Sequence, residues 1–248
     1  MSSEVRIFNA IEGPKPQPGD SWHFGSHLAS AAPLPVLPVT VPLPPGHPWN
    51  QDGLGTCIGN GCGLACVVAI HRATGRWIVE SAQAGEALAH DLYHGANPGD
   101  SGYKQGARLI DALRFAQSTG VIGQDGKRYK IKTFHSLLPS TDINGDVERA
   151  LAAGMAVATG WKWSEAWMAD PAAHFDTLPH PGAPWAGGHC VAIWRAVMKH
   201  PSAGTTALRR DHDLEQSWGA WGVQGGAYFD AALERDPTLL FDAYAVTA

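Results

Sequence analysis

The amino-acid sequence predicts an α+β fold in which the first half of the chain is helical and the second half is rich in strands. Apolar residues recur with helical spacing after residue 57 and between residues 109 and 116, whereas short apolar runs bounded by glycine and proline follow residue 154. Because helices precede strands instead of alternating with them, a parallel βαβ sheet is not expected. The 248 residues are 44% hydrophobic and 17% charged, which is typical of a chain that folds around a core.

Residues 1–48 differ in composition from the rest of the chain. Residues 33–48 read PLPVLPVTVPLPPGHP, with proline at nearly every third position. That composition favours an extended, polyproline-like path, which cannot join the middle of a sheet. We therefore expect a proline-rich N-terminal arm, either a linker or a segment lying along the surface, in which Val36 to Val41 can form an edge strand.

Three helices are expected before the main run of strands. The first starts at Cys57, continues to about Ala73 and stops at Gly75. The second lies within YKQGARLIDALRFAQSTG, residues 103–120, where one face is apolar and Gly120 stands at the C′ position. DVERALAAG, residues 146–154, predicts a shorter third helix that ends at Gly154.

Three later segments have the pattern of strands. They are apolar, rich in β-branched or aromatic residues, and separated by proline and glycine loops. Their sequences are MAVATGW at 155–161, HCVAIWRAVM at 189–198 and GGAYFDAAL at 225–233.

Composition and charge exclude several classes of function. The formal net charge is −5 and there is no basic stripe, so a nucleic-acid partner is not expected. No run approaches the roughly 20 apolar residues of a membrane-spanning helix, and the start, MSSEVRIFNAIEGPKP, lacks the pattern of a secretion signal. These features favour a cytoplasmic or virion-associated protein. The sequence does not predict an oligomeric state.

The four cysteines do not have the spacing of a disulfide framework, so we expect reduced thiols. Cys62 and Cys66 lie one turn apart within the first predicted helix and are interpreted as small core residues. Their spacing is not that of a zinc ribbon, and neither a metal nor a cofactor is expected.

Cys57 has the position of a nucleophile. The stretch QDGLGTC, residues 51–57, places it where a glycine-rich loop turns into a helix. The helix macrodipole favours negative charge at this end, which lowers the pKa of a thiol, and a nearby imidazolium lowers it further. A small buried thiol in a tight turn is the alternative interpretation.

His189 is the candidate base among twelve histidines. In WAGGHCVAIW it follows two glycines and opens an apolar strand, which puts its imidazole at the mouth of a sheet. Further along, LEQSWGAWGVQGGAYF offers Gln216, whose amide can accept a hydrogen bond from the second ring nitrogen, and Trp218, whose indole can shield that bond from water.

Taken together, these segments resemble the papain-like cysteine peptidases. That family has a glutamine six residues before a cysteine at the start of a long helix, then a glycine-flanked histidine opening a strand, then Asn-Ser-Trp-Gly before an aromatic strand. Here the matching residues are Gln51, Cys57, His189 and the stretch QSWGAWGVQGGAYF at 216–229, and GDSGYKQGARLIDALRFAQSTGVI at 99–122 is similar to the family's Gly-Gly-Tyr segment and second helix. GLGTCIGNG resembles the bacterial and viral branch.

The resemblance, which runs from about residue 49 to residue 230, implies a two-lobe fold with a cleft between the lobes. The catalytic domain would span 49–248, with a helical lobe at about 49–135 and a β-rich, barrel-like lobe at about 136–248. It implies a cysteine peptidase, a hydrolase acting on peptide or protein substrates without a cofactor.

The resemblance also assigns roles to single residues. Cys57 would attack the scissile carbonyl, His189 would carry the proton, and the Gln51 amide with the Cys57 backbone N–H would bind the oxyanion. Further positions would bind an extended substrate: the backbone of Ser101 and Gly102, and a side-chain pocket begun by Tyr103 and lined by Ala158 and Cys190.

Three departures from the family pattern bear on activity. Gln216 replaces the orienting asparagine and adds a methylene, which we expect to reduce activity without abolishing it. Position 54, where secreted relatives often have a disulfide cysteine, is Leu54. The first 48 residues do not resemble the helical propeptide of the lysosomal branch.

Two other functions fit the same residues. One is a papain-fold structural component, for example of a phage or other virion, that has lost turnover. The other is a different thiol acyl transfer, such as the cutting of cell-wall cross-links, which would use the same cysteine and histidine.

Overall fold

The computed structural model describes residues 10–13, 33–51, 53–165, 184–199, 209–215, 226–230 and 238–248, with the backbone alone at 199, 209–211, 213–215 and 226–230. The helices in these ranges are α1 (Cys57–Thr74), α2 (Ala82–Ala96), α3 (Leu109–Ser118) and α4 (Ile143–Ala152). The short strands are β1 (Ala10–Ile11), β2 (Val39–Thr40), β3 (Ala107–Arg108), β4 (Val121–Ile122), β5 (Arg128–Tyr129) and β6 (Thr133–Ser136). The longer strands are β7 (Val157–Ser164), β8 (Trp185–Lys199), β9 (Arg209–Glu215), β10 (Gly226–Asp230) and β11 (Leu240–Thr247).

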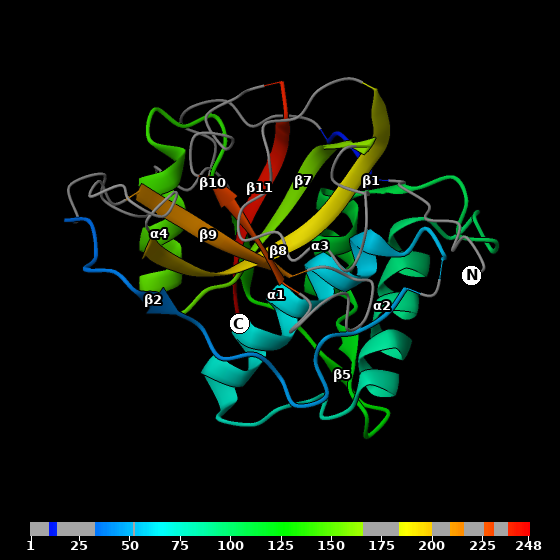
Figure 1. The fold of residues 1–248 in the computed structure, drawn as a ribbon. Coiled ribbons are helices and arrows are strands. Elements are labelled where there is room, and N and C mark those ends of the chain that lie inside the picture. Colours follow the sequence, from blue (N-terminus) through cyan, green and yellow to red (C-terminus); the bar gives the residue numbers. More distant parts are fainter. Residues whose placement is uncertain are drawn as a thin grey trace.

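One antiparallel sheet dominates the second half of the chain. Its strands follow the order β10-β9-β8-β7-β11-β6, and β2 adds to β8 (Figure 1). The strand β11 lies between β7 and β6, so residues near 245 pair with residues near 135 and near 157. Among the described strands the sheet ends at β10 and β6. The predicted order of helices first and strands later is confirmed.

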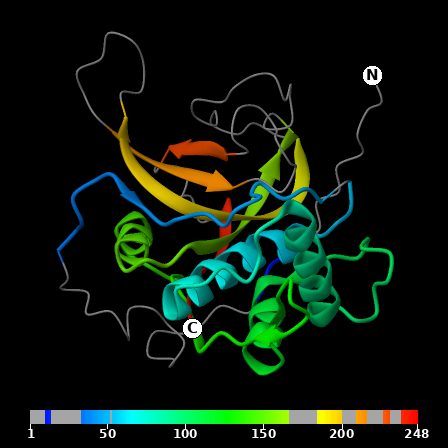
Figure 2. The ribbon, with the colours of Figure 1, turned by 90° about the horizontal axis from the view of Figure 1, so that it is seen from below.

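The helices α1, α2 and α3 gather on one side of this sheet, as Figure 2 shows. The central one is α1, in which every residue from Cys57 to Ile70 is buried. A helix that is apolar on all sides is expected inside a fold, since it has no face to offer to water.

Glycines let α1 approach its neighbours closely. A Cβ at Gly59 would overlap the carbonyl oxygen of Ala89 in α2, and a Cβ at Gly61 would stand 2.6 Å from the sulfur of Cys190 in β8. The run of small residues at the start of α1 therefore fixes this end of the helix between α2 and the sheet.

The ends of two predicted helices are confirmed. The helix α1 begins at Cys57, and Gly75 caps it in the left-handed conformation with φ 71°, where its N–H bonds to the carbonyl of His71. The helix α3 lies within the predicted segment, and Gly120 follows it with φ 95°. The third helix starts three residues earlier than predicted, because the Asp142 side chain accepts a hydrogen bond from Gly145 and caps it.

The helix α2 was not predicted from the sequence. Its apolar face consists mainly of alanine and leucine broken by glycine, so its periodicity is weak. The local signal was Ser81, whose side chain caps the helix by accepting a hydrogen bond from the N–H of Ala84 at 3.2 Å.

The described part of the arm lies along the domain. The strand β2, within the predicted Val36–Val41 segment, pairs with Ala196 and Arg195 of β8. Directly after the arm, Trp49 is 2% exposed and packs against Gly85. No helix in the described ranges is both long and apolar enough to cross a membrane.

Candidate active site

Cys57 is the first residue of α1 and is completely buried. Thr56 precedes it at the N-cap and makes no side-chain cap hydrogen bond, so Cys57 stands in the first turn of the helix, the end toward which the backbone N–H groups point. The positive end of the helix macrodipole stabilises negative charge at this position, whereas complete burial opposes it.

The loop before α1 holds Gln51 beside that helix end. Gln51 is 1% exposed, and its side-chain N–H donates to the carbonyl of Leu54 at 2.5 Å, while the N–H of Leu54 donates to the carbonyl of Gln51 at 2.8 Å. These two bonds close a tight turn that contains Gly53 with φ 74°. The amide of Gln51 is therefore fixed inside the protein, a few residues from Cys57.

A second loop, residues 99–106, is bound to the first. The N–H of Gly55 donates to the carbonyl of Tyr103 at 3.0 Å. Ser101 and Gly102 are exposed, whereas the Tyr103 ring is half-buried against the rings of His90 and His94 from α2, with ring-centre distances of 5.0 and 4.8 Å. The Ser101–Tyr103 backbone thus lies next to the loop that carries Gln51.

Asp100 organises this second loop. Its carboxylate accepts hydrogen bonds from the Tyr93 hydroxyl and the Gln105 N–H, both at 2.6 Å. The Tyr93 oxygen in turn accepts from the N–H of Gly106 at 3.0 Å. Burial works against ionisation of Asp100, but the hydrogen bonds outweigh it and lower the pKa of this carboxyl. Sequence reasoning missed Asp100, although the pattern GDSGYKQG places a turn-forming acid beside the predicted substrate segment.

Replacing Asp100 with alanine should loosen the 99–106 loop. The buried Tyr93 hydroxyl and the part-buried Gln105 N–H would lose their acceptor, and an unsatisfied buried donor typically costs about 1–3 kcal/mol. We expect the free energy of unfolding to fall by about that amount, and Asp100→Asn, which keeps one acceptor oxygen, to lower it less. An unchanged unfolding midpoint in Asp100→Ala would contradict this role.

The same carboxylate should make stability depend on pH. Because its pKa is lowered in the folded chain, Asp100 stabilises the fold above its unfolded pKa of about 3.9, and that contribution is lost as the pH falls through the folded value. The thermal unfolding midpoint of Asp100→Asn should therefore fall less steeply on acidification than that of the parent chain.

His189 lies in β8, opposite Trp161 of β7, and is completely buried. The ring of Trp163 meets it edge-on at a centre distance of 4.7 Å. An indole therefore covers this imidazole from the neighbouring strand, a contact that sequence reasoning missed. The predicted orienting and shielding residues, Gln216 and Trp218, lie outside the described residues.

The contact between α1 and β8 brings the predicted nucleophile and base to one region. Gly61, one helical turn after Cys57, packs on Cys190, the residue after His189. The thiol of Cys57 is near enough to Cys190 to contribute to the raised pKa of that residue. Cys57 and His189 therefore both lie within four residues, along the chain, of the contact between Gly61 of α1 and Cys190 of β8.

The other cysteines have the environment of core residues. Burial, aided by Cys62, raises the pKa of Cys66, and burial with a hydrogen bond to Cys62 raises the pKa of Cys190. The predicted pocket residues Cys190 and Ala158 are both buried on the paired strands β8 and β7. None of the four cysteines forms a disulfide, and no group of three metal-binding side chains occurs in the described part of the chain.

Comparison with solved structures shows the papain-like fold. Xylellain, a cysteine protease from Xylella fastidiosa, matches with a TM-score of 0.72 and 16% identity, over 99% of this chain and 97% of that one. Digestive procathepsin L 3 of Tenebrio molitor matches at 0.66 and 14%, over 99% of this chain and 75% of that one. Bromelain from Ananas comosus, in complex with the E64 inhibitor, matches at 0.60 and 15%, over 83% and 94%.

Neither the scan against family models nor the search of curated proteins gives a match. The assignment of the papain-like fold therefore depends on the comparison of structures alone. The predicted fold class is confirmed.

Proposed function

We propose that this chain, which has the fold of papain-like cysteine proteases, is a thiol peptidase of the bacterial or viral type. The observation that carries the proposal is the position of Cys57 at the N-terminus of the buried helix α1, where that helix touches the strand of His189. A thiol at this helix end and an imidazole nearby are the two groups that a cysteine peptidase needs.

In the proposed reaction, His189 takes the proton of Cys57, and the thiolate attacks the scissile carbonyl carbon. The tetrahedral oxyanion is bound by the Gln51 amide and the Cys57 backbone N–H. The C–N bond then breaks while His189 gives its proton to the leaving amine, which leaves a thioester on Cys57. Water, deprotonated by His189, hydrolyses the thioester and restores the thiol. Gln216 is proposed to orient the imidazole and Trp218 to shield that contact.

The substrate is proposed to be an extended peptide lying along the Ser101–Tyr103 backbone. The exposure of Ser101 and Gly102 supports this, since their backbone groups are open to a ligand. The bond between Gly55 and Tyr103 also supports it, because it joins the proposed peptide-binding loop to the proposed oxyanion loop. Cys190 and Ala158 are proposed to line the side-chain pocket.

Gln51→Ala tests the oxyanion role. Removing one donor of this kind typically lowers kcat by about a hundredfold or more. We expect that loss in kcat with little change in KM, because the bond is made in the transition state. A fall in the unfolding midpoint or a rise in KM that accompanies the loss would point instead to the structure of the turn, because the Gln51 amide also donates to the Leu54 carbonyl.

Labelling of Cys57 at mildly acid pH tests the proposed function directly. A thiolate paired with an imidazolium reacts with iodoacetamide there, whereas a thiol with a pKa of about 8.5 does not. We expect selective alkylation of Cys57, with loss of peptide hydrolysis in parallel. Slow, unselective labelling of the four cysteines would favour the inactive structural component, a function with which the complete burial of Cys57 and His189 also agrees.

A further inference from the structure

Two histidines stand one turn apart on α2, on the face that meets the proposed peptide-binding loop. They are His90 and His94, and both are half-buried. The ring of Tyr103 lies 5.0 Å from the ring of His90 and 4.8 Å from that of His94, measured between ring centres. Residues four apart in a helix are neighbours on its surface. Because both imidazoles contact one tyrosine ring, they point to the same place.

The backbone of Tyr103 has a conformation that requires support. Its φ is 54°, in the left-handed region, which bulky residues rarely adopt and keep only where their surroundings hold them. Besides the two imidazoles, the ring of Tyr93 lies 5.3 Å from the Tyr103 ring. The carbonyl of Tyr103 accepts a hydrogen bond from Gly55, so a change at this residue also reaches the proposed oxyanion loop.

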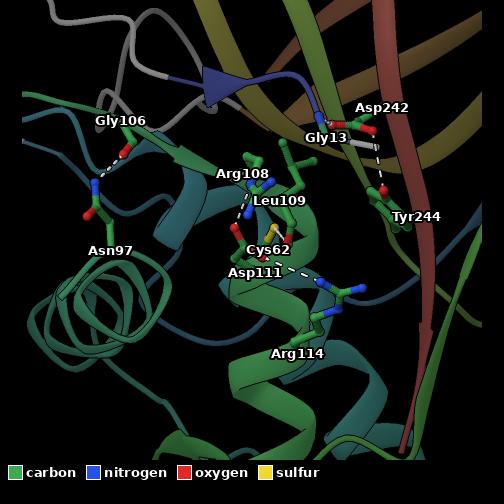
Figure 3. A network of polar contacts seen from close by, with 10 residues as sticks. All are labelled: Gly13, Cys62, Asn97, Gly106, Arg108, Leu109, Asp111, Arg114, Asp242 and Tyr244. Carbon is green, nitrogen blue, oxygen red and sulfur yellow. Dashed lines mark hydrogen bonds and ion pairs between the residues drawn. The ribbon is translucent and has the colours of Figure 1, made fainter. Parts of the chain in front are cut away.

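The rest of the 99–106 loop is fixed to α2 by other contacts. Asn97, the C-cap of α2, donates its side-chain N–H to the carbonyl of Gly106 at 2.6 Å (Figure 3). The Tyr93 hydroxyl donates to Asp100 at 2.6 Å. Both ends of the loop are thus held by the helix, while Tyr103 stands between them with its ring on the histidine pair. A ligand of this pair therefore acts on the middle of the loop.

Two imidazoles one helical turn apart are a chelating pair for a transition metal ion. Neutral imidazole is the commonest protein ligand for metals, and histidines four apart on one helix face bind zinc in a known motif. Imidazole suits Zn²⁺, Cu²⁺ and Ni²⁺, whereas Mg²⁺ and Ca²⁺ prefer carboxylate and carbonyl oxygens. Within the ranges that the structure describes, no third histidine, cysteine or carboxylate completes a group of three. Water would therefore complete the coordination, and the ion would exchange.

We propose that His90 and His94 form a regulatory site for a divalent transition metal ion such as Zn²⁺, which weakens peptide binding by moving Tyr103. The proposal rests on the peptidase function above. To bind one ion, the two ring nitrogens have to converge on a point between the side chains. The Tyr103 ring contacts both imidazoles there, so the ion and the tyrosine ring compete for one position.

The expected effect follows from the fraction of chains that keep Tyr103 in place. If bound ions hold its ring away in about nine chains of ten, the apparent affinity for a peptide falls about tenfold, because only the remaining tenth binds. The loss appears as a rise in KM.

Ion binding is measured first, in the Cys57→Ala background, so that the proposed catalytic thiol offers no ligand. The probe is Ni²⁺ alone, titrated by calorimetry into the parent, His90→Asn, His94→Asn and His135→Asn. The last is the matched control, a half-buried histidine on β6. We expect each α2 variant to bind Ni²⁺ at least about tenfold more weakly, since even indirect partners of a metal site contribute about 10–100-fold. The control should match the parent. Equal affinity in all these chains overturns the proposal.

Paramagnetic broadening then tests where the ion binds. The five tyrosines are labelled as 3-fluorotyrosine, and the fluorine resonance of Tyr103 is identified by its loss in Tyr103→Phe. We expect Ni²⁺ to broaden this resonance in the Cys57→Ala chain, and not when His94→Asn is added. A Tyr103 resonance that stays sharp at saturating Ni²⁺ overturns the proposal.

Hydrolysis in the chains with Cys57 separates this inference from the proposed function. Because Ni²⁺ can also bind Cys57 and His189, the informative part of the inhibition is the part that His90→Asn or His94→Asn removes. A rise in KM of about tenfold with Ni²⁺ in the parent, and a smaller rise in both variants, supports both ideas. Hydrolysis with the same response to Ni²⁺ in all chains keeps the peptidase and overturns the regulatory site. Broadening of Tyr103 that depends on His94, without hydrolysis in any chain, keeps the metal site and overturns the peptidase.

Discussion

Cys57→Ala should remove peptide hydrolysis while the chain keeps its fold. Without the sulfur no thioester can form, and the remaining groups provide only binding and the oxyanion contacts. We expect kcat to fall by at least about a thousandfold, the scale seen when the nucleophile of such a catalytic group is removed. Because Cys57 is small and buried, the change should cost only about 1 kcal/mol of stability.

Cys66→Ala is the matched control for this experiment. Cys66 lies in the same helix and is just as buried, but its pKa is raised by burial and by Cys62, so it remains a neutral thiol. Its variant should keep the hydrolysis rate of the parent chain. Hydrolysis at the parent rate in Cys57→Ala would show that Cys57 is not the nucleophile.

Gly59→Ala should be the most destabilising of the conservative changes in α1. The new methyl group would overlap the carbonyl oxygen of Ala89, which belongs to the α2 backbone and cannot move aside as a side chain can. Overpacking of this kind costs about 1–3 kcal/mol or more, against a gain of about 1 kcal/mol from replacing glycine in a helix. We expect a net loss of about 2 kcal/mol, or roughly 4–8 °C in Tm.

Thermal unfolding followed by circular dichroism measures this loss. Gly99→Ala is the control, because a Cβ there would have only the Asn97 side-chain oxygen nearby, at 3.8 Å. A Tm for Gly59→Ala equal to that of the control would mean that α1 and α2 can separate at no cost. The position of Cys57 would then be less firmly fixed than the structure indicates.

Local patterns predicted the features that depend on local physics. The start of α1 at Cys57 and its end at Gly75 follow from loop glycines and a left-handed cap, both visible within a few residues. The prediction that His189 opens a strand was wrong in one respect: the strand was found from its apolar run, but β8 begins four residues earlier, at Trp185, and includes the two glycines before the histidine. The second helix followed from its apolar face and the glycine at its C′ position, and the strand predicted at 155–161 overlaps β7, which runs from Val157 to Ser164.

Contacts between distant residues could not be predicted in this way. Trp163 meets His189 only because β7 and β8 pair in one register, and a shift of one residue would turn the indole to the other face. Asp100 accepts a hydrogen bond from Tyr93, and Tyr93 belongs to α2, the helix that was not predicted because its periodicity is weak. The bond between Gly13 and Asp242 joins residues 229 positions apart, and nothing in either neighbourhood indicates the other.

The insertion of β11 between β7 and β6 has a consequence for biosynthesis. A ribosome makes β6 and β7 more than 70 residues before it makes Leu240–Thr247. Until then β6 and β7 cannot join one sheet, because β11 is the strand that pairs with both. Closing such a distant pairing is slow, since the entropy of a long loop is lost before the contact is gained. The nascent chain should therefore expose the open edges of β6 and β7 during translation, and proteolytic activity should first appear after residue 247 has emerged.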